Sequence, residues 1–375
     1  MEHPAGNVDS TLLLWYPLTG EMMRMNNNRG RYTYHEITSQ PEAWTEALAV
    51  VQANADRLKA IWQRSQATGL LFTGCGSTYY LSLAAAALAR QAGLPARAAP
   101  ASEIWLFPRL GAGLMGRTLL VAVSRSGETS ETVRAIDAFR QTGGKAVIAV
   151  TCHPGSAVAR RSELTLALPS AQERSMAQTR SFASMLLACQ VIIGHLSGDD
   201  DIVQRLRVLP VMGHRLLDSY GDLAAEIGGQ MAIRRFFFLG NGPCYGLANE
   251  AMLKMKEMSL SESEAYHTLE FRHGPKSMVD QESLVVGLLS DEARAQESAV
   301  LAEMKGLGAR LLVLSENDSP ELGRPIYHVK LGSNLPTGDR LVLYLPILQL
   351  LAYHRAMAKG LNPDVPRHLS AVVVL

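Results

Sequence analysis

Residues 71–80 read LFTGCGSTYY and residues 237–246 read FFLGNGPCYG, and these two stretches decide the fold. Each joins an apolar run to a Gly-x-Gly turn, which a helical segment follows. A buried strand that enters a helix through such a turn is the opening unit of a parallel βαβ sheet. Gly74 and Gly240 begin the two turns and lie 166 residues apart in a chain of 375 residues, so there is room for two copies of one unit.

Two more pairs of segments repeat at nearly the same spacing. Ser124 and Ser290 each follow an apolar run and are again 166 residues apart. Residues 143–152 match residues 308–317 with an offset of about 164. Matched strand–loop–helix joints at an almost constant offset indicate an internal duplication.

The predicted strands are nearly continuous aliphatic or aromatic runs, as expected of strands that helices cover on both faces. Strands of this kind that alternate with helical segments form parallel sheets. We therefore predict an α/β protein with two tandem α/β/α halves. The strands run over residues 119–123, 146–150, 236–239, 284–289 and 311–314.

The domain boundaries follow from the repeat and from the segments around it. Residues 41–62 carry apolar side chains at roughly helical spacing, which predicts one packing helix. Residues 198–213 have an acidic start and contain a proline, which is typical of a linker. We predict an N-terminal arm (1–45), a first half (46–197), a linker (198–214), a second half (215–359) and a C-terminal tail (360–375).

Composition excludes several classes of protein. The chain has 36 Lys+Arg against 35 Asp+Glu, so its net charge of +1 gives no field to gather nucleic acid or anionic lipid. It contains no run of about 20 apolar residues, and the short apolar run 11–16 follows acidic residues rather than a basic signal-peptide region. Four separated cysteines without CxxC fit a reducing compartment. We expect a cytoplasmic protein that binds neither nucleic acid nor membrane.

The loop 124–129, Ser-Arg-Ser-Gly-Glu-Thr, lies where a predicted strand ends and a helix begins. Such a junction offers free backbone N–H groups and the positive end of the helix dipole. Helix capping alone needs one hydroxyl, whereas this loop has three, with a glycine that allows close approach. Ser77 and Thr78 lie on the equivalent turn of the preceding strand. The pattern predicts a phosphate-type ligand held by Ser77, Thr78, Ser124, Ser126, Gly127 and Thr129.

The equivalent loop of the second half, residues 290–295, has lost the glycine and gained two acids. We therefore expect one anion site per chain.

A second constellation places Glu250, Lys254 and Glu257 at i, i+4 and i+7 on one face of a helix. Such a face is usually an exposed row of ion pairs. This helix, however, directly follows the second Gly-x-Gly turn, so it begins at the ligand edge of the sheet.

A metal site is the less favoured interpretation of His267, Glu270 and His273. Their spacing differs from the HExxH of a zinc helix, and Gly-Pro at 274–275 ends any helix there. We predict no metal, and we interpret His273 as a loop histidine that shuttles protons.

The GCGSTYY turn, the Ser-x-Ser-Gly-Glu-Thr loop, LKMKEMSLSESEAY and EFRHGP occur in this order. Together they resemble the SIS (sugar isomerase) domain proteins, above all the isomerase half of glucosamine-6-phosphate synthase and its stand-alone relatives. The resemblance covers about residues 45–370. It implies two flavodoxin-like SIS subdomains, a homodimer, and a phosphosugar bound without metal or organic cofactor.

The resemblance also implies roles for single residues. Glu257 matches the carboxylate that moves a proton between C1 and C2, and Lys254 matches a lysine near the substrate oxygens. His273 matches the histidine that opens the sugar ring, which the neighbouring subunit supplies in the family. The phosphate positions match Thr78, Ser124, Arg125, Ser126 and Thr129, and sugar contacts are expected from Met176 and Gln178 in the segment 173–179 and from Ser370 in the tail.

Two departures from the family pattern limit the function. Ala371 stands where the family's tail lysine is expected and no lysine follows Lys359, so ring opening would depend on His273, with His368 as a second candidate. Only about 45 residues precede the first half, so we do not expect a glutamine-dependent synthase. We expect an aminosugar-phosphate deaminase or isomerase. The alternatives are a non-catalytic phosphosugar-binding or sensing protein and a fructosamine-6-phosphate-type deglycase.

Overall fold

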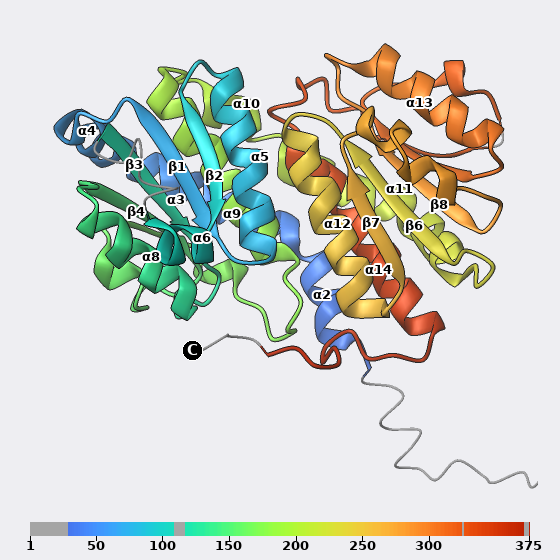
Figure 1. Ribbon diagram of the computed structural model, residues 1–375, viewed down its shortest axis with the longest axis horizontal. Helices are drawn as coiled ribbons and strands as arrows, with labels where there is room; N and C mark the ends of the chain where they lie inside the picture. Colours follow the sequence, from blue (N-terminus) through green and yellow to red (C-terminus); the bar gives the residue numbers. More distant parts are fainter. Residues whose placement is uncertain (1–28, 109–116, 325, 371–374) are drawn as a thin grey trace, which may run out of the picture.

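A computed structural model describes residues 29–108, 117–324, 326–370 and 375, and within them it shows two parallel five-stranded sheets (Figure 1). The first sheet has the order β2-β1-β3-β4-β5, with β1 Gly69–Gly74, β2 Ala96–Pro100, β3 Thr118–Val123, β4 Ala146–Thr151 and β5 Leu164–Ala167. The second has the order β10-β9-β8-β6-β7, with β6 Arg235–Gly240, β7 Glu262–Tyr266, β8 Ser283–Leu288, β9 Arg310–Ser315 and β10 Tyr327–Lys330. Counted along each half, both orders are the flavodoxin-like 2-1-3-4-5. The predicted α/β class with two tandem halves is confirmed.

Helices cover both faces of both sheets. The outer face of the first sheet packs on α6 (Ala101–Leu106) and α8 (Ser130–Gln141), and the outer face of the second on α13 (Arg294–Gly306). The inner faces share one continuous apolar core. The helices of this central layer include α3 (Gln40–Ala53), α4 (Ala55–Ser65), α5 (Ser77–Gln91), α9 (Arg180–Ser197), α11 (Leu209–Gly229), α12 (Pro243–Ser259) and α14 (Leu345–Ala358).

The contact between α5 and α12 joins the two halves and positions the site described below (Figure 1). The helices run in opposite directions, because Gly242 at the start of α12 lies near Gln91 and Lys254 near its end reaches Ser77. Gly246 lies at the crossing. A Cβ at this position would be 2.5 Å from the carbonyl oxygen of Tyr80, so the close approach requires glycine.

The predicted arm is partly a folded element. Its residues 1–28 lie outside the described residues, but α2 (Arg31–Thr38) and the start of α3 fall within it. Thr33 donates hydrogen bonds from its backbone N and Oγ1 to Asp364 Oδ1, at 2.8 and 2.7 Å, which ties α2 to the tail. Trp44 is fully buried. Tertiary contacts therefore fix residues 29–45 of the predicted arm.

The predicted linker 198–214 contains α10 (Ile202–Leu206) and the start of α11. Pro210 lies in the first turn of α11, where no N–H is needed. One local prediction was wrong. The single helix predicted over 41–62 is two helices. Asn54 separates α3 from α4, and its Nδ2 donates to the carbonyl oxygen of Val50 at 2.9 Å. A side chain that bonds its own backbone in this way competes with the helix.

One segment also departs from the expectation that no stretch has the character of a membrane span. By length and composition alone, residues Leu341–Ala358, which include α14, could cross a membrane. Their mean hydropathy is 1.3. In the fold 78% of this segment is buried, and α14 packs on α11 and α12. This burial and these contacts are those of a core helix between the sheets of a folded domain.

Candidate active site

The predicted anion loop is a rigid turn between β3 and α8. Ser124 Oγ accepts a hydrogen bond from the N–H of Gly127 at 3.1 Å, and Ser126 Oγ accepts one from the N–H of Glu128 at 3.2 Å. Gly127 has φ +66°, and a Cβ there would lie 2.0 Å from Ser156 Oγ. Both the conformation and the space therefore require glycine at this position.

The segment after β4 holds this loop in place. The carbonyl oxygens of Arg125 and Gly127 accept the N–H groups of Cys152 and Val158 at 3.1 and 2.9 Å. Thr129 is the N-cap of α8 and forms no side-chain capping bond. The start of α8 thus combines backbone N–H groups, a positive helix end and nearby hydroxyls, which is the chemistry of a phosphate site.

The face of α12 that carries Glu250, Lys254 and Glu257 is buried, so the alternative of an exposed row of ion pairs is wrong. Lys254 Nζ lies 3.3 Å from Glu250 Oε1 and contacts Glu257 Oε2. It also donates to Ser77 Oγ at 3.3 Å. The side chain of Lys254 is 1% exposed and that of Glu257 19%. The contact between halves therefore brings Ser77 of one half to the predicted catalytic residues of the other.

Burial sets the protonation of this cluster. Desolvation raises the pKa of the Glu250 carboxyl to about 8, against the opposing effect of Lys254. Burial alone would lower the pKa of Lys254, but the two neighbouring carboxylates outweigh it, so this pKa is raised. The cluster thus holds the Lys254 ammonium against the partly exposed side chain of Glu257. That arrangement suits a base next to a developing oxyanion.

The hydroxyls of Ser77 and Thr78 serve different partners. Ser77 Oγ donates to Glu250 Oε1 at 3.2 Å. Thr78 Oγ1 accepts the N–H of Cys75 at 2.8 Å and donates to the carbonyl oxygen of Cys75 at 2.9 Å, so this hydroxyl closes the turn after β1. The role of both residues in phosphate binding stays a prediction.

Arg125 connects the anion loop to the predicted sugar-lining segment. Its Nη1 donates to the carbonyl oxygens of Met176 and Ser175 at 2.9 and 3.3 Å, and lies 3.4 Å from Glu173 Oε2. Glu173 in turn caps α9, because its Oε1 accepts the N–H of Thr179 at 2.6 Å. The structure thus joins two segments that the sequence predicts separately.

The sugar-lining segment also meets the tail. The N–H of Met176 donates to the carbonyl oxygen of Asp364 at 3.2 Å. Gln178 Oε1 is buried and has no hydrogen-bond partner among the described residues. A cavity of about 200 Å³ is lined by Glu257 together with Pro366 and Arg367. The tail therefore reaches the wall of the Glu257 cavity. Ser370 is exposed, and Ala371 lies outside the described residues.

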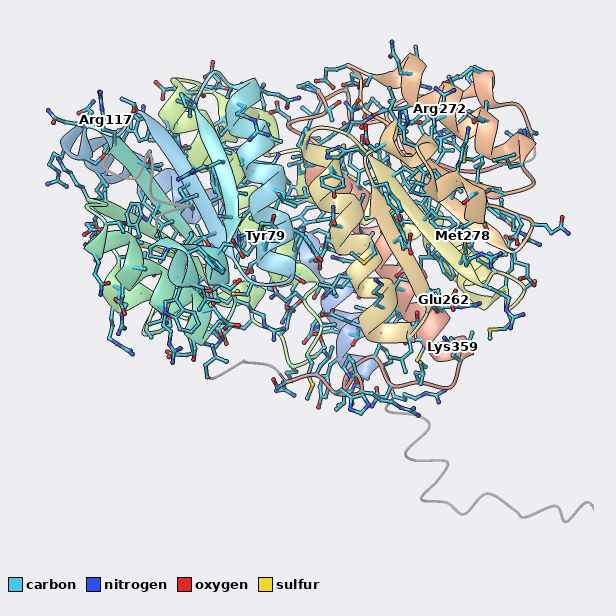
Figure 2. All side chains as sticks on the ribbon, in the orientation of Figure 1. Tyr79, Arg117, Glu262, Arg272, Met278 and Lys359 are labelled. Atoms are coloured by element: carbon cyan, nitrogen blue, oxygen red, sulfur yellow. The ribbon has the colours of Figure 1, made fainter. Side chains whose placement is uncertain are left out.

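His273 lies far from Glu257 within one chain. The Tyr245 ring, near the start of α12, stacks on His267 with 3.7 Å between centroids. Glu257 lies 12 residues further along α12, or about 18 Å along the axis at 1.5 Å per residue. Figure 2 agrees, because Arg272, next to His273, lies at the end opposite Glu262 and Lys359. His273 is exposed on the loop between the short turns η4 (Glu270–Arg272) and η5 (Pro275–Met278).

The loop of the second half that corresponds to 124–129 is engaged by its own chain. Asp291 accepts two hydrogen bonds from the Arg340 guanidinium, both at 2.7 Å, and the Asp291 N–H donates to Thr337 Oγ1 at 2.9 Å. Within the described part of the chain, no group of three or more His, Cys, Asp or Glu residues is arranged to hold a metal.

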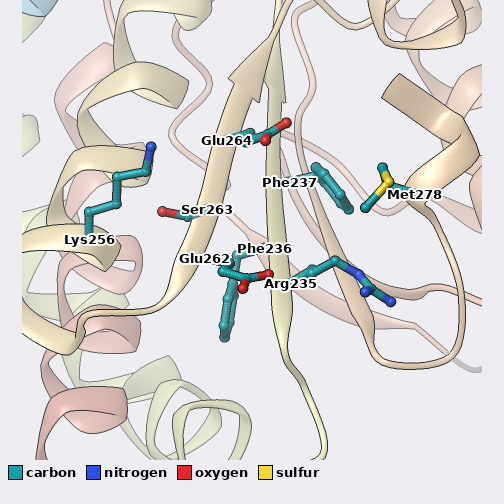
Figure 3. Close-up of a pocket in the computed structure, with 8 residues that line it drawn as sticks. All are labelled: Arg235, Phe236, Phe237, Lys256, Glu262, Ser263, Glu264 and Met278. Atoms are coloured by element: carbon teal, nitrogen blue, oxygen red, sulfur yellow. The ribbon is translucent and has the colours of Figure 1, made fainter. Parts of the chain in front are cut away.

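A separate cavity of about 250 Å³ lies beside the edge strand β7 (Figure 3). Its charged lining is mixed, with Lys256 and Arg235 against Glu262 and Glu264, and Arg235 is already paired with Asp280. This cavity contains none of the predicted site residues. Sequence reasoning gave no separate role to Glu173, which it placed only within the segment 173–179. It placed Glu250 on the face of α12 by helical spacing, without its burial.

The profile of the SIS domain family matches residues 65–194 and 232–330, which is more than half of the chain. The protein therefore belongs to the SIS domain family. A glutamine–fructose-6-phosphate aminotransferase (isomerizing) from Aeropyrum pernix is 32% identical over 356 residues, which cover 91% of this chain and 56% of that protein. The chain thus spans little more than half the length of the curated relatives that it matches.

Two solved structures share the fold over nearly their whole length. The glucosamine-6-phosphate deaminase from Thermotoga maritima is 27% identical, with a TM-score of 0.69 over 88% of this chain and 100% of that one. The C-terminal domain of glucosamine-fructose-6-phosphate aminotransferase from Francisella tularensis is 25% identical, with a TM-score of 0.77 over 88% and 96%.

Proposed function

We propose that this protein is a phosphosugar isomerase of the SIS family that acts on an aminosugar phosphate of the glucosamine 6-phosphate type. The observation that carries the proposal is the buried contact of Lys254 with Ser77 and Glu257. It places a cation and a carboxylate beside the turn that follows β1, next to the anion loop that follows the adjacent strand β3. The names of the Thermotoga maritima deaminase and of the Aeropyrum pernix relative support the choice of substrate class.

The proposed reaction begins with the phosphate bound by the loop 124–129 and the ring opened by His273. Glu257 then removes the proton from C2 and returns it to C1, while the Lys254 ammonium stabilises the negative charge that develops on the substrate. For a 2-amino sugar this transfer gives a C2 imine. Addition of water to the imine releases ammonia and leaves fructose 6-phosphate, so the atoms balance without a cofactor.

The homodimer belongs to the same proposal. Within one chain His273 and Glu257 lie towards opposite ends of α12, so a shared site needs His273 of a second copy. A non-catalytic phosphosugar-binding protein is the second candidate, because Ala371 stands where the family's tail lysine is expected.

The experiment incubates the protein with glucosamine 6-phosphate and measures fructose 6-phosphate and ammonia. Glu257→Gln should lower kcat by about 100-fold or more, because a positioned base contributes that much. Glu262→Gln, an exposed acid at the start of β7, is the matched control and should retain activity. Phosphosugar binding without turnover of any aminosugar or ketose phosphate would leave the second candidate. A bound phosphosugar whose phosphate lies away from residues 124–129 would contradict the anion-loop assignment.

A further inference from the structure

A third cavity lies between α2 and the start of α9, and neither Lys254, Glu257 nor the loop 124–129 lines it. Its volume is about 410 Å³, which is in the range of small-molecule sites. The lining comes from α2 and from the two sides of the sugar-lining segment. It consists of Arg31, Tyr32, His35, Glu36, Arg174 and Arg180.

The side chains that line this cavity carry more positive than negative charge. In the part of the chain that the structure describes, Arg31, Arg174 and Arg180 form no ion pair with a carboxylate. Glu36 is one carboxylate against three guanidinium groups in this lining, and it accepts the backbone N–H groups of Arg174 at 2.5 Å and of Ser175 at 3.3 Å, and also the Ser175 hydroxyl. Three guanidinium groups around one cavity are a local excess in a chain whose net charge is +1. The cavity in Figure 3 has no such excess.

The arginine side chains are partly fixed in position. Arg180 Nε donates to the carbonyl oxygen of Gln172 at 3.0 Å and its Nη1 donates to Ser39 Oγ at 3.1 Å. The Arg174 guanidinium lies 5.3 Å from the centroid of the Tyr32 ring. Side chains held in this way lose less entropy on binding. Arg180 already uses Nε, Nη1 and Nη2 on Gln172 and Ser39, so it contributes mainly its charge. The guanidinium forks of Arg31 and Arg174 suit two phosphate oxygens at once.

We propose that this cavity, which we call the arginine pocket, binds a phosphate-bearing metabolite and thereby acts on the sugar-lining segment. Arg174 lies between Glu173, which contacts Arg125 of the anion loop, and Ser175, which holds Glu36. A ligand that draws Arg174 towards Arg31 therefore pulls on the segment that also positions Met176. The binding does not depend on the proposed function, whereas the effect on catalysis does.

Isothermal titration of the full chain with pyrophosphate tests the binding. We expect two pyrophosphates per chain, one at the anion loop and one in the arginine pocket. Arg31→Gln/Arg174→Gln should lose the second of these and keep the first, and Ser126→Ala/Thr129→Val should do the reverse. The matched control is Arg64→Gln/Arg207→Gln, which removes the same charge from exposed positions elsewhere and should keep both sites.

A single pyrophosphate site that survives Arg31→Gln/Arg174→Gln would overturn the proposal. An equal loss in the Arg64→Gln/Arg207→Gln control would overturn it too, because binding would then follow overall charge. The effect on catalysis is measured as kcat for glucosamine 6-phosphate, since competition at the anion loop changes only KM. Pyrophosphate should change the wild-type kcat by about twofold or more and leave that of Arg31→Gln/Arg174→Gln unchanged. An unchanged wild-type kcat would refute the coupling. If there is no turnover at all, the proposed function fails and the titration still decides the pocket.

Discussion

Glu250 has one oxygen bonded to Ser77 and Lys254 and the other, Oε2, buried without a partner among the described residues. Ionising a carboxyl group that is buried in this way costs free energy. Burial therefore raises the pKa of Glu250 to about 8 from the ordinary 4.5. The residue thus behaves at neutral pH as a neutral hydrogen-bonding group behind the Lys254 cation.

This raised pKa predicts a pH dependence of stability. The folded protein binds the Glu250 proton more tightly than the unfolded chain does, so the stabilisation is complete below 4.5 and is lost as pH rises through about 8. Glu250→Gln keeps a neutral group at all pH values. The variant should therefore gain stability relative to the wild type between about pH 5 and about pH 9.

Thermal unfolding of both proteins across this range measures the effect. Glu264→Gln, which changes an exposed acid on β7, is the control and should show no such trend. A difference in Tm between Glu250→Gln and the wild type that stays constant with pH would show that Glu250 titrates near its ordinary pKa when folded.

The hydroxyls of the anion loop carry a second prediction at this scale. Ser126→Ala/Thr129→Val removes two candidate phosphate donors and keeps the bond from the Gly127 N–H to Ser124 Oγ that closes the turn. Each lost hydrogen bond to a charged group weakens binding by about 1.5–3 kcal/mol, so KM for glucosamine 6-phosphate should rise by about 100-fold or more. The far-UV circular dichroism should be unchanged. A KM equal to that of the wild type would place the phosphate elsewhere.

At the scale of elements, the crossing of α5 and α12 is what assembles the site. Gly246→Ala would put a Cβ 2.5 Å from the Tyr80 carbonyl oxygen and 2.8 Å from Ala84 Cβ. The helices would have to separate, at a cost of about 1–3 kcal/mol, and Lys254 would move away from Ser77. We expect a lower Tm together with a lower kcat.

Gly221→Ala is the matched control for this prediction. Gly221 lies inside α11, and a Cβ there would meet no atom within 4 Å. Alanine is the better helix former, so this change should raise stability by up to about 1 kcal/mol and leave activity unaltered. If both variants lose activity alike, the crossing has no special role in catalysis.

The elements also show how far sequence reasoning reaches. The strands β3, β4, β6, β8 and β9 were predictable because each is a continuous apolar run buried by helices on both faces. The edge strands were not. β2 reads ARAAP and β7 reads ESEAY, so neither carries an apolar run, and pairing with β1 or β6 decides their conformation. The helix break at Asn54 depends on one side-chain bond and has no periodic signal.

The candidate site divides in the same way. The loop 124–129 and the face of α12 were visible because hydroxyl density and helical spacing are local properties of the sequence. The burial of Glu250 and the contact of Glu173 with Arg125 arise between segments that are distant in the chain, so no local pattern contains them. Roles given by the family resemblance, such as the sugar contact expected of Met176, stay predictions.

At the scale of the whole molecule, the two halves share a strand order and differ in what their loops hold. The loop of the first half keeps its hydroxyls and glycine, while Asp291 in the second is paired with the buried Arg340. The inner helices of both halves form one core. Lys254 on α12 of the second half therefore contacts Ser77 on the turn after β1 of the first half. Within the described residues, the candidate site thus takes side chains from both halves of the duplication.

The distance between Glu257 and His273 within a chain predicts how two copies cooperate. If each site takes Glu257 from one copy and His273 from the other, Glu257→Gln and His273→Asn should each be inactive alone. A mixed dimer of the two variants has one site with both changes and one site with neither.

After dissociation and random reassociation, half of the dimers are mixed and about a quarter of the wild-type activity should return. Each variant taken alone through the same treatment is the control. Recovery should fail if both residues of a site come from one chain, and the shared site would then be refuted, because every site in a mixed dimer would carry one of the two changes.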